Sequence, residues 1–246
     1  MYEFSELEGG KISTGDLKGL LNLSYNSKKP KDYKDYQIDP ELSGQRVQVY
    51  KKKGSNEAFV VHRGSQGIHD WGNDLKALAG YDISKSKRFK HAADIQKKAE
   101  AKYGSQNVST LGHSLGSKIA SEVGQNSKEI INLNKYIPPK DRNKPVSDKE
   151  YNIRTSRDPA SLLGPADKNT LTIPSRTLNP VGEHSTETLS RLPEDTMIGR
   201  GHLKKLSKKH LKDLIKRLPK NGKKYAVSGK KKTELVDYCC ERCALN

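Results

Sequence analysis

Apolar residues alternate with polar ones, or form a short unbroken run, in two segments near residue 50. Val47 and Val49 alternate with polar neighbours in "GQRVQVYKKK", and "EAFVVHRG" is an apolar run that stops at Gly64. Alternation is typical of a strand with one buried face, whereas an unbroken run indicates a strand buried on both faces. The pattern therefore predicts two strands, the second more buried than the first.

Three other segments carry apolar residues at helical spacing. "TGDLKGLLNLSY" places three leucines on one side, with Thr14 as candidate N-cap, and "KHAADIQKKAEAKYG" repeats alanine and isoleucine before it stops at Gly104. "SKIASEVGQNS" has the same spacing, and a brief strand, "QNVSTLG", precedes it. Each segment is predicted to be an amphipathic helix, because residues three and four apart share one helix face.

Further strands are expected at "EIINLNKYIP", "EYNIRTS" and "NTLTIP", with turn-forming sequences between them. Strands that alternate with helices favour a parallel sheet, since a helix is the usual connection between parallel neighbours. The predicted fold class is α/β, with a mostly parallel sheet flanked by helices.

Length and charge divide the chain into two parts. A chain of 246 residues has room for one enzyme-sized domain and a small appendage, which we place at residues 1–199 and 200–246. The second part holds 15 Lys or Arg against 4 Asp or Glu, a charge of +11, whereas the first carries +6. Such a basic tail favours a polyanionic partner, either nucleic acid or an anionic membrane surface, over a merely solubilising role.

Targeting signals and cysteine usage favour an intracellular location. "MYEFSELEGG" lacks the basic and apolar regions of a signal peptide, and no window approaches 18 apolar residues. Cys239, Cys240 and Cys243 crowd near one end, which argues against a disulfide framework and for a reducing compartment. They are interpreted as helix-packing residues, because a zinc site would need a fourth ligand from elsewhere.

The stretch "STLGHSLGSKIASEVG" places Ser114 between two glycines, at the junction of a predicted strand and a predicted helix. In a G-x-S-x-G turn of this kind the serine occupies a strained backbone position that exposes its hydroxyl oxygen. The NH of Leu115 would lie at the helix N-terminus, where it can stabilise a developing oxyanion. The context favours a nucleophile over a glycine-rich turn without chemistry.

A serine nucleophile needs a base and a carboxylate that orients the base, and in this fold they follow in the order Ser, Asp, His. Asp158 comes just beyond a predicted strand, at the edge where α/β sheets place their sites, and Pro159 then forces a loop. The alternatives are a simple Asp-Pro turn at this position and Asp141 as the carboxylate. Asp141 is the weaker rival, because it lies in a charged, proline-flanked turn.

For the base, His184 is the leading candidate, in a predicted loop after the last strand. His202 is the second choice, and it falls with His210 in the basic tail, where surface positions are the simpler interpretation. His113 is interpreted as structural, because it cannot reach its own neighbour with good geometry.

These motifs resemble the lipase class 3 family of α/β hydrolases over roughly residues 35–189. "GHSLG" is the family's usual elbow, and "FVVHRGSQGIHDWGNDL" looks like its strand ending in R-G-T or R-G-S followed by D-W-x-x-D. The resemblance implies Ser114 as nucleophile, Asp158 in the family's D-P position, His184 as base and Ser65 as the first oxyanion-hole residue. It assigns Asp70, Trp71 and Asp74 a structural role in fixing the loop beside the site, with a lid-related role as the alternative. The form is similar to intracellular relatives from protists and large DNA viruses, which adds the nucleus, a viral factory or a virion as locations.

The basic tail resembles the SAP domain, a small helical DNA-binding module. The resemblance rests on two apolar stripes and on "SGKKKTELV", which opens the second predicted helix. Five lysines cluster around that helix N-terminus and could hold phosphate by charge and by free backbone NH groups; they are Lys223, Lys224, Lys230, Lys231 and Lys232. Anionic lipid would attract the same lysines.

The sequence thus predicts a serine hydrolase of lipid esters, of lipase or phospholipase type, without a metal or cofactor. Thioester hydrolysis or acyl transfer would use the same catalytic residues. A hypothesis of a different class is a catalytically inactive hydrolase fold that tethers nucleic acid through its tail.

Overall fold

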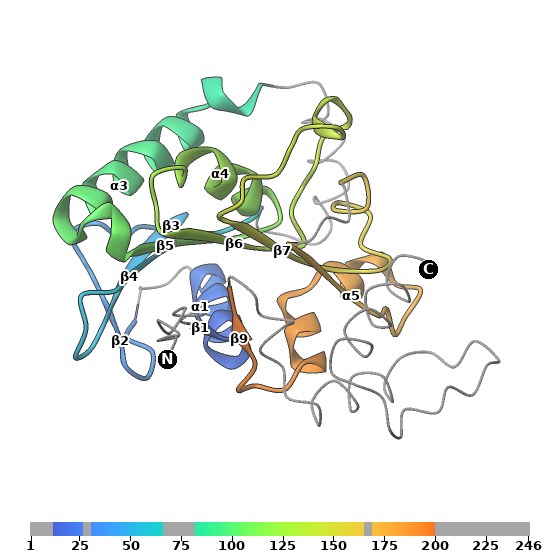
Figure 1. Ribbon diagram of the computed structural model, residues 1–246, viewed down its shortest axis with the longest axis horizontal. Helices are drawn as coiled ribbons and strands as arrows, with labels where there is room; N and C mark the ends of the chain where they lie inside the picture. The colour runs from blue at the N-terminus through green and yellow to red at the C-terminus, as the bar shows by residue number, and fades with distance from the viewer. Residues whose placement is uncertain (1–11, 27–30, 66–81, 165–168, 200–246) are drawn as a thin grey trace, which may run out of the picture.

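The computed structural model describes residues 12–26, 31–65, 82–164 and 169–199 (Figure 1). Its main sheet has the strand order β2-β3-β4-β5-β6-β7-β8, and a separate pair joins β1 to β9. The strands are β1 (Ile12–Ser13), β2 (Tyr36–Ile38), β3 (Val47–Lys52), β4 (Ala58–His62), β5 (Val108–His113), β6 (Glu129–Leu133), β7 (Glu150–Thr155), β8 (Thr170–Ile173) and β9 (Met197–Ile198).

Strands β4 to β8 pair in parallel, whereas β3 pairs antiparallel with both β4 and the edge strand β2. The described α-helices are α1 (Thr14–Tyr25), α3 (Lys87–Tyr103), α4 (Leu115–Val123) and α5 (Pro180–His184). Figure 1 shows α3 and α4 on one face of the sheet and α1 on the other, with α5 near the β7 side. The predicted fold class is confirmed: a mostly parallel sheet flanked by helices, in the α/β-hydrolase arrangement.

Each face of the sheet has its own core. Leucines of α1 pack with Phe59 and Leu111 of β4 and β5, whereas Ile95 of α3 and Ile119 of α4 pack with Val60 on the opposite face. Every residue of β5 is buried, because this strand is central and covered on both faces. Its carboxyl end is therefore a fixed point on which a site can be built.

The helix ends follow the cap chemistry of the sequence, with one correction. Ser13, and not the predicted Thr14, caps α1, since its hydroxyl accepts a hydrogen bond from the Asp16 NH at 3.0 Å. Gly104 ends α3 with φ 84°, a conformation that favours glycine. The predicted strands and helices at β3 to β8, α1, α3 and α4 are all present, but β1, β2 and β9 were not anticipated.

The predicted basic module lies outside the described residues, as do its five lysines, the three cysteines, His202 and His210. Asp70, Trp71 and Asp74 also lie outside them, so these assignments stay predictions. None of the described helices is long and apolar enough to cross a membrane. Within the same ranges no group of His, Cys, Asp and Glu is arranged to hold a metal ion.

Candidate active site

Ser114 lies between β5 and α4 in a backbone conformation that side-chain-bearing residues rarely adopt. Its φ is 58° and its ψ is −128°, and it stands at the N-cap of α4. The surrounding backbone holds this geometry: the Ser114 NH donates to the Leu133 carbonyl at 3.1 Å, and the Ser114 carbonyl accepts from Tyr136 at 3.2 Å. Such conformations cost about 1–3 kcal/mol and persist where the surroundings impose them, commonly at active sites. This is the geometry expected of a nucleophile elbow.

The two glycines of the motif are required by packing. A Cβ added at Gly112 would lie 2.4 Å from the Ser117 Cα, and one added at Gly116 would lie 2.1 Å from the His62 carbonyl oxygen. Neither position has room for any side chain. Ser117 itself is buried, and its hydroxyl donates to the Leu133 carbonyl at 3.2 Å. It therefore packs α4 against the sheet.

The two predicted oxyanion residues lie on segments that approach Ser114. Leu115 is the first residue of α4, where a helix provides no acceptor for the NH. Ser65 follows Gly64, and a Cβ at Gly64 would lie 2.9 Å from the Ser114 Cβ. The backbone that leads into Ser65 thus lies against the nucleophile, which is compatible with an oxyanion hole formed by both NH groups.

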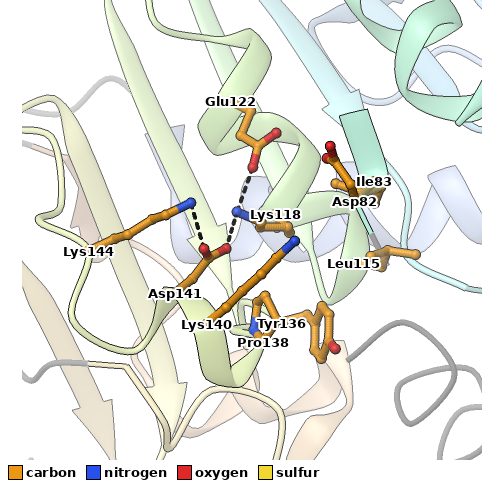
Figure 2. A pocket seen from close by; sticks show the side chains of 10 residues that line it. All are labelled: Asp82, Ile83, Leu115, Lys118, Glu122, Tyr136, Pro138, Lys140, Asp141 and Lys144. Carbon is orange, nitrogen blue, oxygen red and sulfur yellow. Dashed lines mark ion pairs between the residues drawn. The ribbon is translucent and has the colours of Figure 1, made fainter. Parts of the chain in front are cut away.

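A pocket of about 60 Å³ opens beside Leu115, between α4 and the connection from β6 to β7 (Figure 2). Lys118 lines it and pairs with Glu122 and Asp141 at 2.5 Å each, and Lys144 pairs with Asp141 at 2.6 Å. Although burial opposes the effect, these lysines hold the pKa of Asp141 below its ordinary value. The ion pairs therefore give Asp141 a structural role, in which it holds the β6–β7 connection against α4.

Asp158 and His184 form a buried hydrogen-bonded pair. Asp158 is the third residue after β7, at the carboxyl edge of the sheet, and His184 ends the short helix α5. His184 Nδ1 lies 2.7 Å from Asp158 Oδ1, and the Ala160 NH donates to the same oxygen at 3.2 Å. A carboxylate on Nδ1 favours the tautomer whose Nε2 can accept a proton. The prediction of a loop at His184 is wrong, because Asn179 caps a helical turn there through the Val181 NH.

Glu183, the residue before His184, is held by long-range backbone contacts and by a buried ion pair. The Glu183 carbonyl accepts hydrogen bonds from Asn134 at 3.2 Å and Thr155 at 2.9 Å. The Glu183 carboxylate is fully buried and pairs with both terminal nitrogens of Arg191, at 2.6 and 3.0 Å. Although burial opposes it, Arg191 and two backbone NH groups lower the pKa of Glu183 to about 2. None of these contacts has a short-range sequence signal.

His113 links His184 to the Ser114 turn. Its Nε2 lies 2.8 Å from the His184 carbonyl oxygen, and the two imidazole centroids are 5.0 Å apart. Ser114 Oγ is buried and has no hydrogen-bond partner among the described residues, so no hydrogen bond joins it to His184 Nε2 in this structure. Catalytic hydrogen bonds often tighten only when substrate binds. The predicted Ser, Asp and His thus lie in one region of the fold. Their order along the chain alone could not establish this proximity.

The comparisons with known proteins found similarity to one family model and to solved structures of lipases. A family model described as "Phospholipase-like: Tle-like phospholipase domain" matches residues 16–129. A triacylglycerol lipase from Penicillium expansum has a similar structure, with 18% identity, 66% of this chain and 79% of that chain covered, and a TM-score of 0.39. The Rhizomucor miehei lipase propeptide complex is similar at 16% identity, covering 61% of this chain and 62% of that one, with a TM-score of 0.39. The search of curated proteins found no match.

Proposed function

We propose that this protein is a serine carboxylic-ester hydrolase that acts on lipid esters, with Ser114 as nucleophile, His184 as base and Asp158 as the carboxylate that orients the base. The observation that carries the proposal is the conformation of Ser114, with φ 58° at the junction of β5 and α4. The buried hydrogen bond between His184 and Asp158, beside the same strand end, supports it. A glycine-rich turn without chemistry explains neither the strain nor the pair.

The reaction follows from these positions. Ser114 Oγ attacks the acyl carbon while His184 Nε2 takes its proton, and the NH groups of Ser65 and Leu115 stabilise the oxyanion. Collapse breaks the ester bond, and the departing alcohol oxygen takes the proton from His184. Water then attacks the acyl-serine while His184 takes its proton; the bond between the acyl carbon and Ser114 Oγ breaks, Oγ takes the proton back from His184, and the carboxylic acid leaves. Asp158 holds Nδ1 throughout and stabilises the imidazolium.

The substrate class rests on the similarity to known proteins. The matched family model is described as a phospholipase domain, which supports a phospholipid or another acylglycerol as substrate. Rates on phosphatidylcholine vesicles and on a triacylglycerol emulsion would separate phospholipase from lipase action. A matched thioester, and an alcohol acceptor added to the ester assay, would reveal thioester hydrolysis or acyl transfer.

The test of the proposal is hydrolysis of short- and long-chain p-nitrophenyl esters together with labelling by a fluorophosphonate probe. Ser114→Ala is expected to lower kcat by about 10⁴-fold or more and to abolish labelling, because no other group can form the acyl-enzyme. The control is Ser121→Ala on the same helix, whose hydroxyl bonds to the Ser117 carbonyl at 3.0 Å. A wild-type protein that neither hydrolyses esters nor reacts with the probe would instead favour the inactive tethering protein.

The basic tail is proposed to tether the enzyme to nucleic acid or to an anionic surface. Its charge of +11 supports this role. Removal of residues 200–246 should abolish salt-sensitive binding to duplex DNA and to phosphatidylserine vesicles and leave ester hydrolysis intact. Comparison of the two ligands at matched salt identifies the partner, and binding that survives the deletion would contradict the assignment.

A further inference from the structure

One chain of hydrogen bonds runs through the site along residues outside the proposed triad. The Gly64 NH donates to the Tyr25 hydroxyl at 2.9 Å, and that hydroxyl lies 2.6 Å from His113 Nδ1. His113 Nε2 lies 2.8 Å from the His184 carbonyl oxygen. The chain therefore begins beside the oxyanion residue Ser65 and ends on the main chain of the base.

The direction of every bond in this chain is determined by chemistry. A backbone NH can only donate, so the Tyr25 oxygen accepts from Gly64 and directs its own proton to His113 Nδ1. His113 must then be the Nε2–H tautomer, which donates to the His184 carbonyl, since a carbonyl can only accept. Every polar atom in the chain is satisfied by this arrangement. Burial, and then the neighbouring His184, lower the pKa of His113 to about 3, which keeps its imidazole neutral.

The hydrogen-bond chain joins four parts of the fold that strand pairing alone does not hold together: α1, the loop after β4, β5 and α5. Tyr25 is the last residue of α1, which packs on β4 and β5. A Cβ added at Gly64 would lie 2.4 Å from the Tyr25 oxygen, so the hydroxyl is seated against the loop after β4. The Tyr25 and His113 rings meet edge to face, with centroids 5.5 Å apart. His113 in turn immediately precedes Ser114, and its far nitrogen reaches the end of α5.

We propose that Tyr25 and His113 are positioning residues that fix the spacing between the oxyanion loop, the nucleophile and the base. This inference rests on the proposed function, because the parts it aligns are the catalytic ones. A displacement of about 1 Å between reacting groups can cost 10²-fold in rate. Loss of the Tyr25 hydroxyl leaves the Gly64 NH and His113 Nδ1 without their partners, so both ends of the chain can shift.

The test uses Tyr25→Phe, which removes one oxygen atom. We expect kcat to fall by about 10-fold or more with KM within about twofold of wild type, because alignment is lost and binding is kept. Tyr50→Phe is the control: its hydroxyl is buried and donates to Gln48 at 2.6 Å, on a strand that carries no site residue. The control should lower the melting temperature as Tyr25→Phe does, with kcat unchanged.

Variants at His113 test the direction of the hydrogen bonds that pass through this residue. A glutamine amide can retain a donor near the Nε2 position, so His113→Gln should keep more activity than His113→Phe. The double variant Tyr25→Phe, His113→Phe should be no slower than the worse single variant, since a chain that acts as a unit is broken only once. Additive losses, equal losses in Tyr25→Phe and Tyr50→Phe, or wild-type kcat in Tyr25→Phe would each overturn the proposal.

Fluorophosphonate labelling keeps this inference separable from the proposed function. If wild type is labelled at Ser114 and Tyr25→Phe is labelled at the same rate, the enzyme assignment stands and the positioning role is wrong. If wild type is not labelled at all, the proposed function fails, and the positioning role fails with it. Slower labelling of Tyr25→Phe than of Tyr50→Phe at equal melting temperature supports both.

Discussion

The two halves of the candidate site are held in place by different forces. The nucleophile half is a contiguous strand, turn and helix in which Gly112 and Gly116 allow backbone segments to approach too closely for any side chain. The acid–base half comes from separate segments, and polar contacts between residues far apart in sequence, such as Glu183 with Asn134 and Thr155, hold it. Close packing at the elbow requires glycines at fixed spacing, so it is visible as a short motif in the sequence. A polar network between separate segments produces no such motif. The comparison explains why "GHSLG" is readable and the histidine context is not.

Asp158→Asn should disrupt the acid–base half of the site most severely. Its side chain keeps the size of the carboxylate but can no longer favour the Nδ1–H tautomer of His184, so we expect kcat to fall by about 10³- to 10⁴-fold with little change in stability. The matched control is Asp94→Asn, whose carboxylate is 53% exposed in a surface ion pair. Steady-state ester hydrolysis measures both. Activity in Asp158→Asn equal to that of the control would remove Asp158 from the triad.

The polar network of the acid–base half is tested by Glu183→Gln. The amide keeps an acceptor for the backbone NH groups but leaves the guanidinium of Arg191 uncompensated, and breaking such a buried pair costs about 3–5 kcal/mol of unfolding free energy. Glu187→Gln is the control, because its ion pair with Lys18 is largely exposed and such pairs contribute about 0–1 kcal/mol. Denaturant unfolding measures the difference.

The same carboxylate predicts the acid dependence of stability. Because the pKa of Glu183 falls to about 2 on folding, from an ordinary value of 4.5, its contribution is present above pH 4.5 and is lost as pH falls toward about 2. Wild type should therefore lose stability more steeply than Glu183→Gln in this window. Parallel curves for the two proteins would contradict the buried ion pair.

The packing of the nucleophile half is tested by Gly116→Ala. A Cβ there would lie 2.1 Å from a backbone oxygen of β4, so the loop toward Ser65 must shift. We expect a loss of about 1–3 kcal/mol in stability and a fall in kcat of roughly 10²-fold from misalignment. Gly44→Ala is the control, since a Cβ there meets no atom within 4 Å. A Gly116→Ala protein as active and stable as Gly44→Ala would show that the elbow does not need this close approach.

The sequence predicts the central sheet well because its strands are buried. Runs such as "EAFVVH" and "NVSTLG" have few other stable arrangements, and they became β4 and β5. The edge strand β2, three residues long, and α5, five residues long, were missed. Short elements carry too few apolar residues to establish a period, and tertiary contacts decide their conformation.

Residues of the candidate site could be predicted only where a polar side chain comes just after a predicted strand. Asp158 was found because it lies just past β7, and its hydrogen bond to His184 favours it over Asp141 as the partner of the base. Tyr25 was not singled out, since a tyrosine at the end of an amphipathic helix gives no local signal. Its partners lie 39 and 88 residues away, and only the folded chain brings them together.

Asn179→Ala should give a smaller change than the variants above, and it tests whether the stability of α5 affects the position of His184. Asn179 caps α5 by accepting a hydrogen bond from the Val181 NH at 3.0 Å, and removing such a cap costs about 1 kcal/mol. Since His184 is also held by Asp158 and by His113, we expect Asn179→Ala to lower stability by that amount and to change kcat by less than about twofold.

The control for this cap is Ser86→Ala, which removes the equivalent cap of α3 on the other face of the sheet, where the Ser86 hydroxyl accepts from the Phe89 NH at 3.0 Å. Both variants should unfold at similar denaturant concentrations and hydrolyse p-nitrophenyl esters at the wild-type rate. A selective loss of kcat in Asn179→Ala would mean that the helical turn itself places the imidazole. The acid–base half would then depend on local backbone structure, as the nucleophile half does, and the contrast between them would disappear.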